Sequence, residues 1–108
     1  MKIYIAGKIT GDASYYAKFI IAEREIQDAG HAVLNPAHLP EGMSKSDYMR
    51  ICFAMIDVAD EVWTLPDCDM SEGALLEIQY CNYIGKPVRA IALRTELKEE
   101  NSGTTDVL

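Results

Sequence analysis

The sequence predicts a single α/β domain, a three-layer fold in which helices cover both faces of a doubly wound parallel sheet. Segments rich in β-branched residues alternate with segments whose apolar residues recur at helical spacing, which is typical of α/β proteins. The strand-like segments 2–6, 60–66 and 86–93 are almost continuously apolar, as expected for strands buried on both faces. Right-handed crossovers then favour a Rossmann- or flavodoxin-like sheet of four to five strands, in an order near 2-1-3-4.

In the first half of the chain, two predicted strands enclose one helix. The first strand is KIYIA at 2–6, and a turn follows it. Thr10 and Asp12 are residue types that cap helices, and the apolar pattern after them predicts a helix of about 17 residues. Gly30 is suited to end that helix. The second strand is HAVLN at 31–35, which stops before a proline.

The second half of the chain repeats the alternation after a loop with two prolines and a glycine. Ser46 or Asp47 is expected to cap a second helix with an apolar stripe. The third strand is predicted over 60–66, the third helix over 71–85 and the fourth strand over 86–93.

The predicted domain covers residues 1–94. The remaining segment, 95–108, is first charged and then small and polar, so we expect a weak helix that leads into a flexible tail. A length of 108 residues agrees with one domain.

The charge of the chain limits its partners. It has 17 acidic and 10 basic residues, a net charge of -7 and no basic run, which argues against binding to a nucleic-acid polymer. A small phosphorylated ligand remains compatible, because one loop can hold a phosphate locally. No apolar stretch is long enough to span a membrane, and the N-terminal apolar stretch is too short for a signal peptide.

The cysteine pattern bears on the compartment. Cys52, Cys68 and Cys81 are odd in number and form no CxxC pair, which argues against a disulfide framework. The pattern predicts a reducing compartment, the cytoplasm. The two histidines are not spaced as zinc ligands with any cysteine, so we expect no metal and no organic cofactor.

The strand order also predicts where a ligand would bind. In a doubly wound sheet the ligand crevice lies beyond the carboxyl ends of the strands, where the order reverses. Here that point lies between the first and third strands, and segments 7–11 and 66–71 follow those strands. Glu77 belongs to the helix that leaves the second segment, so its side chain could face the crevice.

Glu77 is an unusual residue for its place. It stands among Leu75, Leu76 and Ile78, and Gly73 lies one helical turn before it. A glutamate on a helix is most often a solvated residue. Its alternative role is chemical, because a carboxylate can attack the anomeric carbon of a sugar and hold it as a covalent ester. Gly73 would then leave room for the sugar.

The turn after the first strand is a second candidate. Gly7 and Gly11 enclose Lys8 and Ile9, and the backbone N–H groups and the lysine could bind an anion. The turn matches neither the dinucleotide-binding GxGxxG motif nor a Walker A loop, so it could equally be a tight strand-to-helix turn. Ser71, at the start of the third helix, could cap that helix or help to bind a phosphate.

Further polar side chains are expected near the crevice. Tyr15 and Tyr16 open the first helix, and either could stack on a base or hydrogen-bond a carboxylate. Asp67 and Asp69 follow the third strand, and either could be a general acid or a ribose ligand. His38 lies in a loop that could overhang the site, where it could act as an acid. Each of them also has an ordinary explanation as an aromatic packing residue or a polar loop residue.

Several motifs together resemble the nucleoside 2-deoxyribosyltransferase-like superfamily: AGKITG, NPAHLPEG, DYMRICFAMIDVADEVWTLP and SEGALLEIQYCNYIGKPV. The resemblance extends over residues 1–92 and is strongest over 60–88. It is nearest to a compact, largely uncharacterised branch that is common in phages and bacteria. It implies a sheet that usually has five strands, and a homo-oligomer, a dimer or larger, in which a neighbour helps to complete the site.

The resemblance also implies roles for individual residues. Glu77 would be the nucleophile that forms a deoxyribosyl–enzyme intermediate, which water or a second base then resolves. The glycine-containing turn and Ser71 would contact the sugar or its 5′-phosphate, and Tyr15 or Tyr16 would orient the nucleophile. The aspartate that the family carries on the second helix falls at Cys52 in this sequence.

Three functional hypotheses follow. The leading one is an enzyme that cleaves the N-glycosidic bond of a nucleoside or its 5′-monophosphate through Glu77, as a hydrolase or a transferase, with Asp69 as the candidate acid. The alternative is a non-catalytic protein that binds a nucleotide or a nucleotide-derived signal in the same crevice. The third is an α/β oligomer that serves as a protein-interaction unit.

Overall fold

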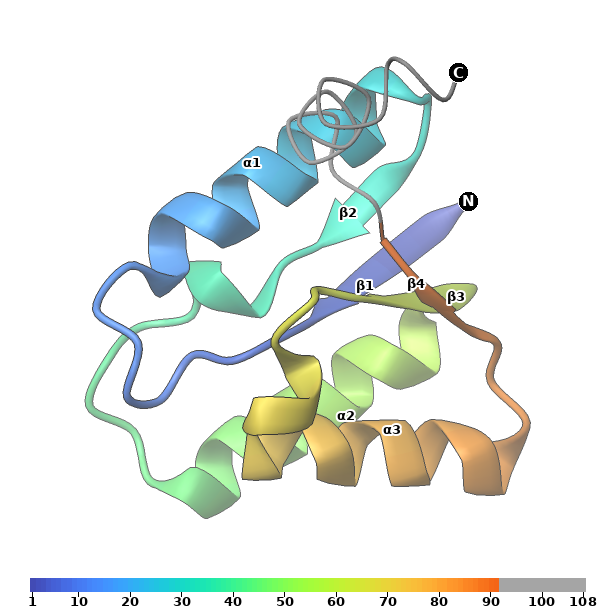
Figure 1. The fold of residues 1–108 in the computed structure, drawn as a ribbon. Coiled ribbons are helices and arrows are strands. Elements are labelled where there is room, and N and C mark those ends of the chain that lie inside the picture. The colour runs from blue at the N-terminus through green and yellow to red at the C-terminus, as the bar shows by residue number, and fades with distance from the viewer. Residues whose placement is uncertain (92–108) are drawn as a thin grey trace, which may run out of the picture.

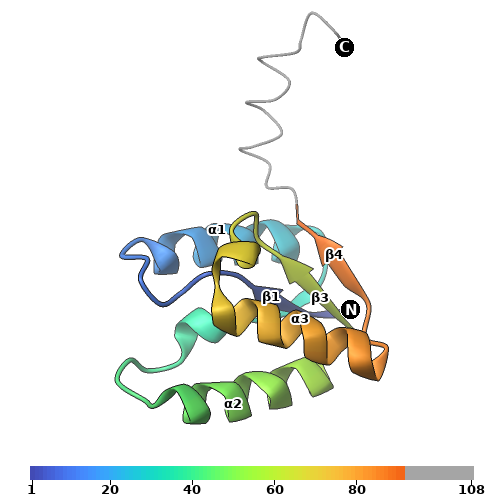
Figure 2. The ribbon, with the colours of Figure 1, turned by 60° about the horizontal axis from the view of Figure 1, so that its bottom comes forward.

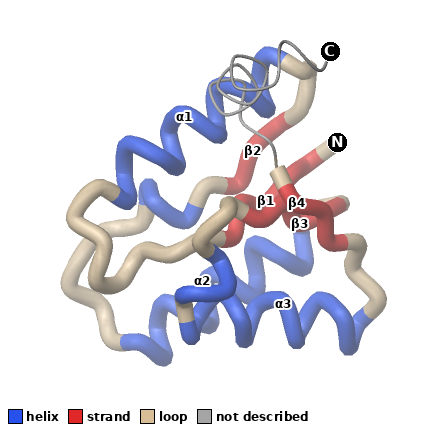
Figure 3. Tube along the Cα trace, in the orientation of Figure 1, coloured by secondary structure: helices blue, strands red, loops and turns tan. Residues whose placement is uncertain are grey.

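The computed structural model describes residues 1–91, so the predicted weak helix and tail over 95–108 lie outside the described residues. Figures 1 and 3 show a sheet between helices. The strands are β1 (Lys2–Ala6), β2 (Ala32–Leu34), β3 (Glu61–Thr64) and β4 (Val88–Ala90). The helices are α1 (Tyr15–Asp28), α2 (Lys45–Val58) and α3 (Glu72–Ile84), with short 3-10 turns η1 (Pro36–His38) and η2 (Cys68–Met70).

The sheet has the predicted doubly wound topology. Its strands follow the order β2-β1-β3-β4 and all pair in parallel. Helix α1 covers one face, and α2 and α3 lie side by side on the other (Figures 1 and 2). The prediction of a three-layer α/β fold is therefore confirmed, with four strands among the described residues.

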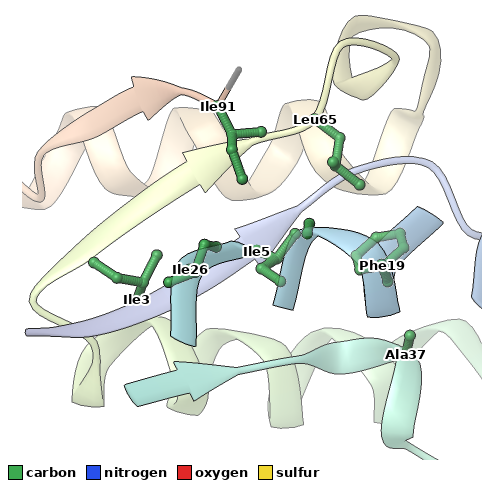
Figure 4. Close-up of a cluster of buried hydrophobic side chains, with 8 residues drawn as sticks. Ile3, Ile5, Phe19, Ile26, Ala37, Leu65 and Ile91 are labelled. Carbon is green, nitrogen blue, oxygen red and sulfur yellow. The ribbon is translucent and has the colours of Figure 1, made fainter. Parts of the chain in front are cut away.

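Strand β1 supplies side chains to two separate cores. Ile3 and Ile5 point toward α1, where they pack with Phe19 and Ile26, and all four side chains are essentially fully buried (Figure 4). The alternate residues of β1 point toward α2 and α3, as the two-residue period of a strand requires. Tyr4 is one of these, so one core contains a phenol and the other does not.

The first helix starts later than predicted. It begins at Tyr15 after Ser14, whose side chain makes no capping hydrogen bond, and it has 14 residues rather than about 17. The prediction that Thr10 and Asp12 cap it is wrong. Asp12 Oδ1 instead accepts a hydrogen bond from the Ser14 amide at 2.8 Å, because aspartate readily bonds backbone two residues on. Gly30 follows the helix with a φ of 96°, as expected for its stop.

The other two helices differ in how well their starts were predicted. Ser44 caps α2, and its Oγ accepts a hydrogen bond from the Asp47 amide at 3.2 Å, so Ser46 and Asp47 lie within the first turn instead of capping it. Ser71 caps α3 as predicted, accepting from the Ala74 amide at 3.2 Å.

The strands after β1 are shorter than predicted, although residues beside them still hydrogen-bond the neighbouring strand, as the Leu65 amide does with the Ala6 carbonyl at 2.8 Å. Asp60 lies just outside β3, and its Oδ2 accepts a hydrogen bond from the Lys2 amide at 2.7 Å. This bond ties together the amino ends of β1 and β3. Gly85 ends α3 in the left-handed region, with a φ of 78°, as the sequence predicts.

At the opposite edge of the sheet, the turn after β1 lies directly against the end of β3. A Cβ on Gly7 would lie 2.7 Å from Leu65 Cδ1, so a larger residue would force the two segments apart. The close approach brings the two loops together at the point where the strand order reverses.

Candidate active site

An open cleft of about 1140 Å³ lies at the carboxyl ends of β1 and β3. Its lining comes from four segments: the turn after β1, the loop after β2, one face of α2, and the start of α3. This is the position where a doubly wound sheet binds its ligands. The volume is of the size found for small-molecule sites, roughly 300–1000 Å³, or slightly above it.

Glu77 lies in this cleft and is almost completely buried, with 7% of its surface exposed. The hydroxyl of Tyr4 donates a hydrogen bond to Glu77 Oε2 at 2.9 Å. Burial raises the pKa of Glu77 to about 7, although hydrogen bonds from Tyr4 and Cys52 act in the opposite direction. At neutral pH the carboxyl group therefore exchanges between its acid and carboxylate forms.

The groups around Glu77 are weak acids that stay neutral. Burial raises the pKa of Cys52 and of Cys81 to about 11, and the nearby Glu77 adds to both increases. Burial, and then the charge of Glu77, also raise the pKa of Tyr4 well above its usual value. Glu77 is thus held by neutral hydrogen-bond donors rather than by a cation.

Sequence reasoning missed two members of this cluster. Tyr4 looks like an ordinary strand residue, and Cys52 looks like part of an apolar helix stripe. A signal was present for Tyr4, because a buried tyrosine needs a partner for its hydroxyl group and no other residue of β1 is polar and buried. The structure brings Tyr4 to Glu77, whereas Tyr15, one of the two tyrosines expected to orient Glu77, lies beside Glu41.

The turn after β1 lines the cleft with all four of its candidate residues: Gly7, Lys8, Ile9 and Gly11. Gly11 has a φ of 81°, a conformation that favours glycine. The Lys8 amide donates to Asp67 Oδ1 at 3.1 Å, so this N–H group is already used within the protein.

A lysine joins this turn to the loop after β3. The ammonium group of Lys18 makes ion pairs with both Asp12 and Asp67. The hydrogen bond from Lys18 is the largest cause of the lowered pKa of Asp12. Asp67 also accepts a hydrogen bond from the Lys8 amide. The Lys18 ammonium group, the two carboxylates and this amide therefore connect the turn after β1 to the loop after β3.

The remaining candidates divide into two groups. Tyr15, Ser71 and Gly73 line the cleft, and a Cβ on Gly73 would meet only Ser71 Oγ, at 4.0 Å, so the space beside it is open. Three candidates do not line it: Tyr16, His38 and Asp69.

Tyr16 and His38 contact each other away from the cleft. Their rings meet edge to face at 5.8 Å, and His38 Nε2 lies 3.0 Å from Glu23 Oε1. Asp69 lies in η2, one turn before α3. The structure therefore gathers Glu77, the turn after β1 and the start of α3, but leaves these three residues outside the lining.

Within residues 1–91, no group of three or more His, Cys, Asp and Glu side chains is placed to hold a metal ion. In the same part of the chain, no helix is both long enough and apolar enough to cross a membrane.

The fold is similar to that of nucleoside 2-deoxyribosyltransferases, in agreement with the resemblance of the sequence motifs. The structure is similar to that of a 2-deoxyribosyltransferase from the psychrotolerant bacterium Bacillus psychrosaccharolyticus, with a TM-score of 0.64. The two chains are 24% identical, and the similarity covers 83% of this chain and 71% of that one. At this identity the likeness concerns the fold.

The chain belongs to the family described as a domain of unknown function, DUF4406, whose profile matches residues 1–90. Among curated proteins no match is found. The family name carries no activity, so the function has to be argued from the cleft itself.

Proposed function

We propose that the protein cleaves the N-glycosidic bond of a nucleoside, ribo or deoxyribo, or of its 5′-monophosphate, with Glu77 as the nucleophile. The observation that carries the proposal is the buried carboxyl group of Glu77 in an open cleft, with one oxygen held by Tyr4. A nucleophilic carboxylate needs a fixed orientation and a partly desolvated environment, and Glu77 has both.

The reaction would proceed in two steps. An oxygen of Glu77 forms a bond to the anomeric carbon while the bond from that carbon to the base nitrogen breaks, and the electron pair leaves with the base. The base takes up a proton from solvent and departs as the free base. Water then attacks the same carbon of the glycosyl ester and gives a proton back to solvent, which releases the sugar and restores the carboxylate. A second base in place of water would give a new nucleoside.

Tyr4 has a defined part in this scheme. Its hydroxyl donates to Oε2, which fixes the orientation of the carboxyl group toward the cleft. The same hydrogen bond favours the carboxylate over the acid, and only the carboxylate is nucleophilic.

The start of α3 and the turn after β1 would hold the sugar end of the substrate. Gly73 leaves open space one turn before Glu77, and Ser71 lies at the same helix end. Lys8 adds a positive charge where a 5′-phosphate would lie. The fold similarity to a 2-deoxyribosyltransferase supports the same class of substrate. Because the cleft is open to water, we favour a hydrolase over a transferase.

A second candidate is a non-catalytic protein that binds a nucleotide in the same cleft. The observation that favours it is the absence of a ready proton donor in contact with Glu77, among the described residues. Tyr4, Cys52 and Cys81 all have a raised pKa, so none of them gives up a proton easily near pH 7.

The setting of the protein is part of the proposal. The three cysteines are free thiols, which supports a reducing compartment such as the cytoplasm. We also propose a homo-oligomer, because exposed apolar side chains lie on α3, where Leu75 and Leu76 are both more than 40% exposed and Tyr83 is 92% exposed.

The direct test is chromatography of the free base released from a panel of nucleosides and nucleoside monophosphates. Wild type should release base, and Glu77→Gln should reduce the rate by a factor on the order of 1000 or more, because the amide is not a nucleophile. Asp28→Asn is the matched control, since it makes the same carboxylate-to-amide change at the far end of α1.

Activity that survives Glu77→Gln would refute the covalent mechanism. No base release from any substrate, together with a rise in melting temperature on adding one of them, would favour the binding protein.

A further inference from the structure

The lining of the cleft comes from two groups of segments, here treated as two walls. One wall consists of the turn after β1 and the start of α3, which supply small or polar residues such as Gly7, Ser71 and Gly73 together with the apolar Ile9 and Leu76. The other wall, here called the bulky wall, consists of Leu39, Glu41, Tyr48 and Met49 together with Tyr15 of α1. Of the residues in the bulky wall, only Tyr15 was predicted from the sequence to belong to the site.

The bulky wall lies close to Glu77. Tyr48 and Met49 precede Cys52 by four and three positions on α2, so they share its face of the helix within one turn. Cys52 in turn hydrogen-bonds Glu77. In a nucleoside the base is attached to the carbon that Glu77 would attack, so a nucleoside bound at Glu77 would have its base in the same cleft as this wall.

The loop that carries Glu41 is fixed to the rest of the protein. The Tyr48 hydroxyl donates to the Pro40 carbonyl at 2.6 Å and accepts from the Met43 amide at 3.4 Å. Upstream, Asn35 Oδ1 accepts from the Ala37 amide at 2.8 Å. Glu41 lies between Pro40 and Met43, so its carboxylate is presented to the cleft from an anchored segment rather than from a free loop.

The chemistry of the wall suits a flat, partly apolar ring with hydrogen-bond donors on one edge. Leu39, Tyr48 and Met49 provide apolar and aromatic surface for such a ring. Glu41 provides two carboxylate oxygens, which accept hydrogen bonds and donate none. Partial burial and then the nearby Glu41 carboxylate raise the pKa of Tyr15, whose hydroxyl also hydrogen-bonds that carboxylate. Each carboxylate oxygen has two lone pairs, so both oxygens of Glu41 can still accept a hydrogen bond from a ligand.

We propose that the bulky wall is the base-binding subsite and that Glu41 selects a base with an amino group next to a ring N–H, as in guanine. Two adjacent N–H donors match the two oxygens of a carboxylate, and a base that lacks the amino group leaves one oxygen without its partner. This inference rests on the proposed function, since it assigns the substrate class of the same cleft.

The test compares deoxyguanosine with deoxyinosine, which differ only in the 2-amino group. The kcat/KM of wild type should be about tenfold higher for deoxyguanosine than for deoxyinosine. This preference is near the low end of what two hydrogen bonds from one base to a carboxylate provide, because Glu41 is exposed. Glu41→Gln should bring the ratio close to one, because the amide keeps a single acceptor oxygen for the ring N–H of either base. Asp47→Asn, an exposed residue outside the cleft lining, should leave the ratio unchanged.

A ratio near one in wild type, or a preference that Glu41→Gln does not alter, would overturn the assignment of Glu41 while Glu77-dependent base release still supported the proposed function. If no nucleoside is cleaved, the proposed function fails, and the ratio of the two dissociation constants tests the subsite instead. Tighter binding of deoxyguanosine that is lost in Glu41→Gln would support it, and equal binding would overturn it.

Discussion

The two faces of the sheet are both well packed, but they carry different chemistry. On the α1 face, the buried cluster is entirely apolar, with Ile3, Ile5 and Phe19 at its centre (Figure 4). On the α2 and α3 face, the buried Tyr4 and Cys52 adjoin Glu77. Burying a carboxyl group costs stability even when it is hydrogen-bonded. We infer that one face of β1 provides stability while the other gives up some of it to position a reactive group.

The largest expected effect on stability comes from the α1 face. Phe19→Ala removes a fully buried ring from the apolar cluster and should lower the free energy of unfolding by about 3–5 kcal/mol. Denaturant titration of the two proteins measures this loss. Base release per folded molecule, assayed well below the melting temperature, should be little changed, because Phe19 does not line the cleft.

Phe53→Ala is the matched substitution on the other side of the sheet. Phe53 is only partly buried and stacks on Tyr80 with ring centres 4.4 Å apart. Its loss should therefore cost clearly less than that of Phe19. If the two variants lost equal stability, or if Phe19→Ala abolished base release while still folded, the division between the faces would not hold.

The second expected effect is that the contribution of Glu77 to the free energy of unfolding falls as pH rises. Burial raises the pKa of Glu77 from 4.5 to about 7. The folded state then binds the proton more tightly than the unfolded state, so this contribution to stability is complete below pH 4.5 and is lost as pH rises to about 7. The loss should be on the order of 3 kcal/mol, since one pKa unit corresponds to about 1.4 kcal/mol.

Activity should show the opposite trend over the same range, because only the carboxylate is nucleophilic. Base release should rise with pH to a midpoint near 7. Urea unfolding of wild type and Glu77→Gln at a series of pH values isolates the contribution of this one group, since the amide does not titrate. A stability difference between them that does not change between pH 4.5 and 7 would contradict the raised pKa.

The fold could be predicted from the sequence because hydrophobic pattern decides it. The alternation of strand and helix patterns fixed the order of elements, and Ser71 and Gly85 marked both ends of α3 through their capping chemistry. The start of α1 could not be predicted, because Asp12 is a good cap by type but bonds the Ser14 amide and Lys18 instead. Capping propensity gave way there to competing local contacts, one with a residue two positions away and one with a residue six positions away.

The site was only partly predictable for a similar reason. Glu77 could be found because a carboxylate is conspicuous among apolar helix residues. Tyr4 and Cys52 both fit apolar patterns, and the only signals were that a buried hydroxyl needs a partner and that the family's aspartate falls at Cys52. The packing of β1 against α2 and α3 is what shows that both residues meet Glu77. Glu41 lies in a loop with no periodic pattern, so nothing in the sequence places its side chain in the cleft.

The smallest expected effect gives the most direct test of the difference between the two faces of the sheet. The substitution removes a single oxygen atom from the face covered by α2 and α3. Tyr4→Phe keeps the ring in its core but removes the hydroxyl that donates to Glu77 Oε2. That bond lowers the pKa of Glu77, so its loss should move the midpoint of the pH profile of base release upward by about one pH unit. At pH 7 the carboxylate fraction of Glu77 then falls from about one half to about one tenth, so the rate should fall about fivefold and should recover at higher pH.

The shift in midpoint separates a positioning role of Tyr4 from a merely structural one, which would lower the rate equally at every pH. Tyr80→Phe is the matched control, because it removes a hydroxyl that donates to Asp57 Oδ1 at 2.6 Å, outside the cleft lining. It should leave the midpoint in place. A midpoint that stays near 7 in Tyr4→Phe would mean that the Tyr4 hydroxyl does not influence the titration of Glu77. Tyr4 would then be a packing residue of its core, as Ile3 and Ile5 are on the other face.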